Sequence, residues 1–151
     1  MTCLWFDTNA EEAVKFYLSN FPGSRILATS HYWEGGPMPA GTVLTITFEM
    51  LGQKFMALNG GPQYKFTEAI SLMIECDTQA EIDGYWDKLL AGGGQTQACG
   101  WLKDKFGLSW QVVPAGLEEL IGGPNSAKVM DAVMKMIKLD IATMKAAAEG
   151  K

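Results

Sequence analysis

His31 is the only histidine among the 151 residues, and histidine is the side chain best suited to moving protons near neutral pH. It stands in the run His31-Tyr32-Trp33, directly before a stretch rich in glycine and proline. A histidine at the mouth of a binding site could donate or accept a proton there, so His31 is the leading catalytic candidate. A lone histidine in a strand is more often structural or solvent-exposed, and that alternative stays open.

Four tryptophans lie on or beside segments with strand-like patterns. Aromatic side chains on sheets usually belong to the core, but several together can line an apolar pocket that suits a flat organic ligand. The tryptophans in question are Trp5, Trp33, Trp101 and Trp110. Two strand carboxylates, Glu49 and Glu75, are expected on a solvent face, with a cavity wall as the alternative.

The three cysteines, Cys3, Cys76 and Cys99, are far apart and form no CxxC pair. Structural zinc sites have short paired spacings, so these cysteines and His31 do not predict one. Their odd number also argues against a disulfide framework. We expect Cys3 and Cys76 to be small buried apolar residues, because no neighbouring positive charge would activate a thiolate. Thiol reactivity itself is left open.

These side chains must be held by elements that occur in the same order twice. The first half has the pattern of strand, helix, strand, loop and hairpin, at 2–6, 10–21, 24–33, 33–42 and 43–58. The second half has the pattern of strand, helix and two short strands, at 70–76, 80–90, 95–102 and 109–113. Apolar periodicity predicts the helices and strands, while glycine and proline mark the turns.

A repeated pentapeptide supports this duplication. DTNAE begins at Asp7 and DTQAE begins at Asp77, 70 residues later. At the same offset Leu4 matches Ile74, Phe16 matches Trp86 and Gly23 matches Gly93. Each pentapeptide predicts a capping box, Thr8 with Glu11 and Thr78 with Glu81, in which side chains bond the free N–H groups of a helix start. Such a cap contributes about 1 kcal/mol to stability.

The C-terminal part differs from both halves. We expect a short helix at 114–121, a break at 122–124, and one or two longer helices at 127–148. Apolar residues recur at helical spacing, namely Met130, Val133, Met134, Ile137, Ile141 and Met144. A methionine-rich stripe can bind varied partners, but more often such a stripe covers a core or a dimer contact.

Four segments carry a resemblance to a known family: LWFDTNAEEAVKFY, SLMIECDTQAEIDGYWDKL, FGLSWQVVP and AVMKMIKLDIATMKAA. They resemble the PhnB-like family, widely labelled "3-demethylubiquinone-9 3-methyltransferase domain". That family belongs to the glyoxalase/bleomycin-resistance/dihydroxybiphenyl-dioxygenase group, the vicinal oxygen chelate superfamily. The similarity extends along essentially the whole chain.

The resemblance implies an α+β fold in which two tandem βαβββ modules form a curled mixed sheet around a cavity, usually in a homodimer. We place the first module at 1–62, the second at 67–114 and a helical tail at 115–151, all within one domain. Whether the modules pair within one chain or between two chains is left open.

The resemblance also implies where a divalent metal would be held in metal-dependent relatives, through side chains on four strands. Carried over, those positions fall at Thr2, Cys3 or Leu4, at Asn59 or Leu58, at Ile70 or Ser71, and at Gln111. No histidine stands on any of these strands, and Gln111 replaces the family's usual acid. We therefore expect no metal cofactor, and we place Asn59 and Gln111 with Trp5, Trp33 and Trp101 as ligand-binding residues.

Composition excludes several classes of protein. Apolar residues make up 48% and charged residues 19%, which is typical of a globular domain. A net charge of −5 with scattered lysines argues against nucleic-acid binding. No apolar run approaches membrane length, and the start of the chain lacks the pattern of a signal peptide. We expect a cytoplasmic protein.

Three functions stay open. We favour a protein that binds a small aromatic or amphipathic molecule in a metal-free cavity. The first alternative is an enzyme of the superfamily, a lyase, isomerase or dioxygenase, with His31 or unusual metal ligands. The second is an interaction protein acting through its methionine-rich tail. Methyltransferase chemistry is not expected, because no glycine cluster forms a GxGxxG turn between strand and helix.

Overall fold

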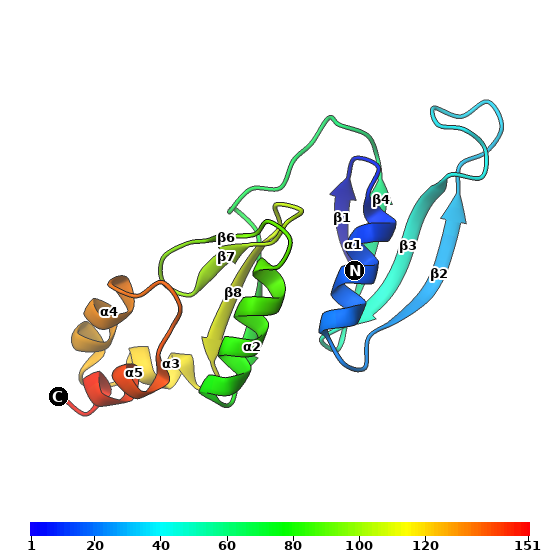
Figure 1. Ribbon diagram of the computed structural model, residues 1–151. Coiled ribbons are helices and arrows are strands. Elements are labelled where there is room, and N and C mark those ends of the chain that lie inside the picture. The colour runs from blue at the N-terminus through cyan, green and yellow to red at the C-terminus, as the bar shows by residue number, and fades with distance from the viewer. The chain divides into compact units, whose positions relative to one another are not determined.

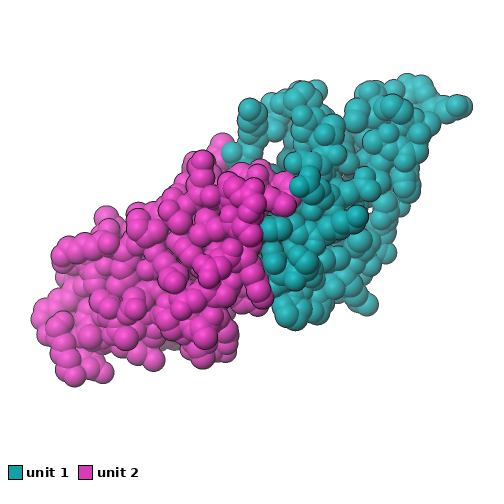
Figure 2. All heavy atoms as spheres, viewed as in Figure 1, with its two compact units in different colours: residues 1–66 teal, residues 67–151 magenta.

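The computed structural model describes residues 1–151 as two compact units, Met1–Phe66 and Thr67–Lys151. Figure 2 colours the two units separately. Each unit contains a four-stranded mixed sheet with a helix packed on one of its faces, and the second unit adds three C-terminal helices. No helix has the length and apolar character that crossing a membrane requires.

The first unit is a βαβββ module. Its elements are β1 (Thr2–Phe6), α1 (Ala10–Asn20), β2 (Arg25–His31), β3 (Val43–Met50) and β4 (Gln53–Asn59). The strands lie in the order β1-β4-β3-β2, with β1 parallel to β4 and the other neighbours antiparallel (Figure 1).

The second unit repeats this topology. Its sheet is made of β5 (Ser71–Cys76), β6 (Gln95–Thr96), β7 (Trp101–Lys103) and β8 (Ser109–Pro114), with α2 (Gln79–Leu90) after β5. The order β5-β8-β7-β6 matches that of the first sheet strand for strand. The predicted α+β fold with two βαβββ modules is confirmed. The two sheets are separate and neither is closed.

Strict alternation of side chains explains why each sheet has a buried face. In β3 and β4 the alternate residues Ile46, Phe48, Phe55 and Ala57 are buried, while their neighbours are half-buried or exposed. Phe48 and Phe55 are register partners whose rings stack at 5.7 Å. Helix α1 covers this face with its own apolar residues, namely Ala10, Ala13, Val14 and Tyr17. Each large apolar side chain buried there contributes about 2 kcal/mol.

The two copies of the pentapeptide begin their helices differently. In α2, Thr78 is the N-cap and its Oγ1 accepts from Glu81 N at 3.2 Å, while Glu81 Oε2 accepts from Asp77 N at 3.3 Å. The second capping box is therefore confirmed, although Glu81 returns one residue further than predicted. In α1, Asn9 is the N-cap and makes no side-chain bond. The predicted first capping box is wrong.

This difference shifts the helices by one residue relative to the pentapeptides. Ala10 and Gln79, which open the helices, are 69 residues apart, whereas the pentapeptides are 70 apart. The fully buried aromatic of α1 is Tyr17, and it corresponds in this register to Trp86 of α2. The predicted pairing of Phe16 with Trp86 used the 70-residue offset of the pentapeptides, and it is wrong by one residue because one more residue precedes α1 than α2.

The predicted strand at 95–102 is two short strands, β6 and β7, joined by a tight turn. Cys99 has φ of 63° and Gly100 has φ of 83° within that turn. A Cβ on Gly100 would lie 2.8 Å from Cγ of Leu139, so the close approach of the tail requires glycine there. The turn breaks a segment whose composition alone suits a continuous strand.

The tail forms three short helices, α3 (Leu117–Gly122), α4 (Ser126–Met134) and α5 (Ile141–Ala148). They share a buried cluster made of Val113, Val129, Val133, Leu139, Met144 and Ala147. The predicted apolar stripe is not continuous, because the chain leaves helical geometry between α4 and α5. Of its members Val133 and Met144 are buried, whereas Met130, Met134 and Ile137 are exposed.

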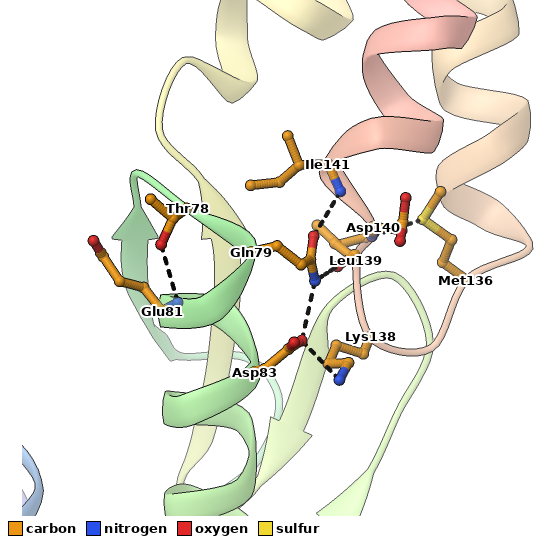
Figure 3. Close-up of polar contacts among 9 residues, drawn as sticks. All are labelled: Thr78, Gln79, Glu81, Asp83, Met136, Lys138, Leu139, Asp140 and Ile141. Carbon is orange, nitrogen blue, oxygen red and sulfur yellow. Dashed lines mark hydrogen bonds and ion pairs between the residues drawn. The ribbon is translucent and has the colours of Figure 1, made fainter.

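Gln79 joins the tail to α2. Its Nε2 donates to Leu139 O at 3.0 Å and to Asp83 Oδ1 at 3.1 Å, and its Oε1 accepts from Ile141 N at 2.8 Å. Asp83 also pairs with Lys138 at 2.8 Å. Figure 3 shows these bonds between the N-terminal part of α2 and residues 138–141 of the tail.

Candidate ligand-binding face

Each sheet has one face that its own helix does not cover, and we call it the open face. On the second sheet, Ile74, Leu102 and Trp110 belong to the buried set on the helix side. The residues between them therefore lie on the open face, because side chains alternate along a strand. By this alternation the open face carries Ser71, Met73, Glu75, Trp101, Lys103, Ser109, Gln111 and Val113. Ser109 and Val113 are nevertheless buried, and Val113 belongs to the tail cluster.

Three of these residues form a row across three neighbouring strands. Gln111 of β8 is the register partner of Met73 on β5 and of Trp101 on β7. With neighbouring strands about 4.8 Å apart, the row extends about 10 Å. Trp101 and Gln111 are half-buried, and Met73 is 49% exposed. The row places an aromatic, an amide and a thioether side by side.

The amide of Gln111 has a defined partner. Its Nε2 donates to Ser71 Oγ at 2.8 Å, between two half-buried side chains on β8 and β5. The bond leaves the carbonyl oxygen of Gln111 and the hydroxyl proton of Ser71 for other partners. A ligand group that both donates and accepts would complement this pair.

Charged groups lie beyond the row. Lys103 forms an ion pair with Glu68, and Gln97 donates to the same carboxylate. The hydrogen bond from Lys103 holds the pKa of Glu68 below its ordinary value. Glu75 is exposed and takes part in no ion pair. Ser109, next to Lys103 in register, is fully buried and its hydroxyl has no partner.

The open face of the first sheet carries Trp5, but the chain itself packs against this indole. Trp5 Nε1 donates to Gly61 O at 2.8 Å, and the Trp5 and Tyr64 rings meet edge to face at 4.9 Å. A Cβ on Gly60 would lie 2.5 Å from the Trp5 ring, so only glycine fits beneath it. Trp5 is thus half-buried by a loop of its own unit.

Asn59 lies on the helix side of the first sheet, away from Trp5. It is 2% exposed, its Oδ1 accepts from Ala10 N at 2.9 Å, and its Nδ2 donates to Val43 O at 3.0 Å. Asn59, which we predicted to bind a ligand, instead caps α1 in place of Thr8. It does not join the other ligand-binding candidates on an open face.

The remaining candidates do not belong to the row. His31 ends β2 and is exposed. Its side chain makes no hydrogen bond or ion pair, so no second group is bonded to the imidazole to assist proton transfer. Trp33 is 57% exposed in the following loop, against Gly36 and Tyr32. Trp110 is fully buried on the helix side, where its Nε1 donates to Asp104 Oδ2 at 2.9 Å. The suggestion that Trp110 lines a pocket is wrong.

The residues at the implied metal positions do not match the donor set of a divalent cation. Gln111 and Ser71 are neutral and bonded to each other, and Asn59 is used by α1 and β3. Cys3 is exposed on the open face of the first sheet, and partial burial raises the pKa of its thiol. No three His, Cys, Asp or Glu residues gather as metal ligands would. Such cations favour carboxylates and imidazoles.

Met73 was missed among the candidates. The signal was available, because strict alternation in the run Ser71-Leu72-Met73-Ile74-Glu75-Cys76 places Ser71, Met73 and Glu75 on one face. Cys76 lies on the other face and is fully buried. Burial, and then the charges of Glu81 and Asp77, raise the pKa of the Cys76 thiol to about 11. Cys76 is thus the buried residue that we predicted, whereas the same prediction for Cys3 is wrong, because Cys3 is exposed.

Two βαβββ modules, each with one sheet face that its own helix does not cover, define a protein of the glyoxalase/bleomycin-resistance type. Within that superfamily, the chain belongs to the 3-demethylubiquinone-9 3-methyltransferase family, the PhnB-like family, whose model matches residues 1–113. No curated protein matches the chain significantly.

Solved structures agree with this assignment. The PhnB protein of Bacillus cereus is 39% identical, with a TM-score of 0.68 over 76% of this chain and 98% of that one. A Pseudomonas aeruginosa protein is 22% identical, with a TM-score of 0.61 over 75% and 94%. The fosfomycin resistance protein FosX of Listeria monocytogenes, solved with Mn(II) and sulfate, is 13% identical, with a TM-score of 0.55 over 80% and 92%. The last two likenesses show the fold alone.

Proposed function

We propose that this protein binds a small aromatic or amphipathic organic molecule on the open face of the second sheet, without a divalent metal. The observation that carries the proposal is the row of Met73, Gln111 and Trp101, placed side by side by the register of three strands. An aromatic surface offers stacking, a thioether adapts its shape, and an oriented amide gives direction. The row is about 10 Å long, the scale of a bicyclic aromatic molecule.

A sheet face is only one wall of a binding site, whereas small-molecule sites are concave. We propose that a homodimer supplies the enclosure, with the second wall coming from the second copy of the chain. Sedimentation of the purified protein measures the oligomeric state, and a dimer is the expected result. A monomer at micromolar concentration would contradict this part of the proposal.

Other functions have less support in the described contacts. An acid/base enzyme built on His31 would need a partner group, and His31 has none. A methyltransferase site would need glycines at a strand-to-helix turn, but Asp7-Thr8-Asn9 and Asp77-Thr78 stand there. A tail that acts as a docking stripe would need one continuous apolar face, yet the stripe is interrupted between α4 and α5 and Met144 is fully buried, although Met130 and Met134 are exposed.

The test combines native mass spectrometry of gently purified protein with ligand-observed NMR against small aromatic compounds. We expect a bound organic molecule, no stoichiometric divalent metal, and weaker binding after Trp101→Ala. Trp33→Ala is the matched control, because Trp33 is exposed in a loop of the first unit and is not part of the proposed row. One transition metal per chain, or equal losses for the two variants, would overturn the proposal.

A further inference from the structure

The charges around the row suggest which ligands the open face can accept. Lys103 is the basic residue nearest the row along β7, and Glu68 already pairs with it. Glu75 lies two residues beyond Met73 on the same face and has no cationic partner. A ligand carboxylate would find no unpaired cation there and would meet the negative charge of Glu75.

The polar groups within the row are neutral and already oriented. Because Gln111 Nε2 donates to Ser71 Oγ, the amide cannot turn without losing that bond. Its carbonyl oxygen is left to accept a hydrogen bond, and the Ser71 hydroxyl is left to donate one. Both residues are half-buried, so solvent competes less for these positions than at an exposed site.

From this arrangement we infer that the ligand is uncharged and carries adjacent hydrogen-bond donor and acceptor groups, such as a carboxamide, held at the Gln111–Ser71 pair. The rest of the ligand lies flat along Trp101 and Met73. The inference rests on the proposed function and adds the ligand's charge and polar group to it. A site that hydrogen-bonds a neutral group rejects analogues that leave its polar atoms unpaired.

Matched probe pairs test this inference: benzamide with benzoate, and 2-naphthamide with 2-naphthoate. The two members of a pair share a ring and differ in charge at neutral pH. Titration calorimetry or ligand-observed NMR on the full chain gives the affinity ratio. We expect each amide to bind at least about tenfold more tightly than its carboxylate, with the larger ring binding more tightly.

Three variants separate the polar pair from the apolar row. Gln111→Leu and Ser71→Ala remove the pair by independent routes, and each should lower the amide-to-carboxylate ratio to about threefold or less. Lys15→Ala, at an exposed position of α1 on the helix side of the first sheet, should leave the ratio unchanged. Circular dichroism verifies folding, and either of the two pair variants suffices if the other fails to fold.

The outcomes distinguish the two proposals. Equal binding of amide and carboxylate, tighter binding of the carboxylate, or an unchanged ratio in the folded pair variants would overturn the neutral-ligand inference while ligand binding itself stands. Failure of all four probes to bind at millimolar concentration would overturn both.

Discussion

Gln79 and Leu139, 60 residues apart in the chain, are joined by a hydrogen bond of 3.0 Å from Nε2 of Gln79 to the carbonyl oxygen of Leu139. The same side chain accepts from Ile141 N at 2.8 Å, so one amide satisfies two backbone groups of the tail. Figure 3 shows how both bonds converge on one residue of α2.

Gln79→Ala should therefore loosen the tail. Both backbone groups lose their partner in a half-buried place, which costs about 1–3 kcal/mol. Hydrogen exchange should speed up at Ile141 and in α5 while β1–β4 are unchanged. Lys138→Ala is the control, because the Asp83–Lys138 ion pair is exposed and should contribute little. Equal exchange in both variants would show that the amide does not hold the tail.

Asn59→Ala should destabilise the first unit by about 2–3 kcal/mol, because it removes the buried cap of α1 and a partly buried bond to Val43 O. Urea denaturation measures the loss. Asn9→Ala is the matched control: Asn9 holds the N-cap position but makes no side-chain bond, so its loss should be below about 0.5 kcal/mol. A larger effect at Asn9 would contradict the assignment of the cap to Asn59.

The two pentapeptides allow a direct comparison. Thr78→Ala should cost about 1 kcal/mol, because Thr78 caps α2 through its bond with Glu81 N. Thr8→Ala should be nearly neutral, since Thr8 is exposed and does not cap α1. Thermal unfolding of both variants provides the measurement. Similar losses of stability in the two variants would mean that Thr8 caps its helix as Thr78 does, which would contradict the assignment.

The lowered pKa of Asp140 predicts that the stability of the tail depends on pH. Its Oδ1 accepts from Thr143 N at 2.8 Å, and this bond to the backbone lowers the pKa of Asp140 below 3.8. A lowered folded-state pKa means that the stabilisation is complete above pH 3.8 and is lost as pH falls through the folded value. Asp140→Asn keeps an accepting oxygen but should abolish this dependence. Exchange at Thr143 between pH 5 and about 3 tests it.

Cys76 should be the slowest thiol to react with iodoacetamide. It is fully buried and its pKa is raised to about 11, so almost no thiolate exists near pH 8. Stabilisation by the neutral thiol is complete below pH 9 and is lost as pH rises through about 11. Mass spectrometry of native protein should find Cys3 alkylated first, because it is exposed. Urea should remove the difference.

Patterns within one strand or helix of the sequence predicted which side chains of that element are buried. Alternation in β3 and β4, and the apolar spacing of α1, place Phe48, Phe55 and Tyr17 in the core as observed. The same alternation separates Trp110 from its neighbour Gln111, although the tryptophans were grouped by type and not by face. Trp110 was placed with the pocket candidates because it is a tryptophan, although the alternation of side chains along its strand already indicated the opposite face.

Contacts between distant residues could not be predicted in this way. Asn59 caps a helix 49 residues earlier, and nothing near Asn59 in the chain marks it as a cap. The turn at Cys99 and Gly100 depends on the approach of Leu139, which only the folded tail provides. Both cases belong to tertiary structure, where distance along the chain no longer indicates distance in space.

The distant cap of α1 also has a consequence during synthesis. A ribosome releases the chain from its N-terminus, so the residues of α1 emerge well before Asn59 does. Until β4 leaves the exit tunnel, the Ala10 amide has only water as its partner, and an 11-residue helix is marginal by itself. The nascent first module should therefore become protease-resistant in one late step, once the whole of β4 is outside.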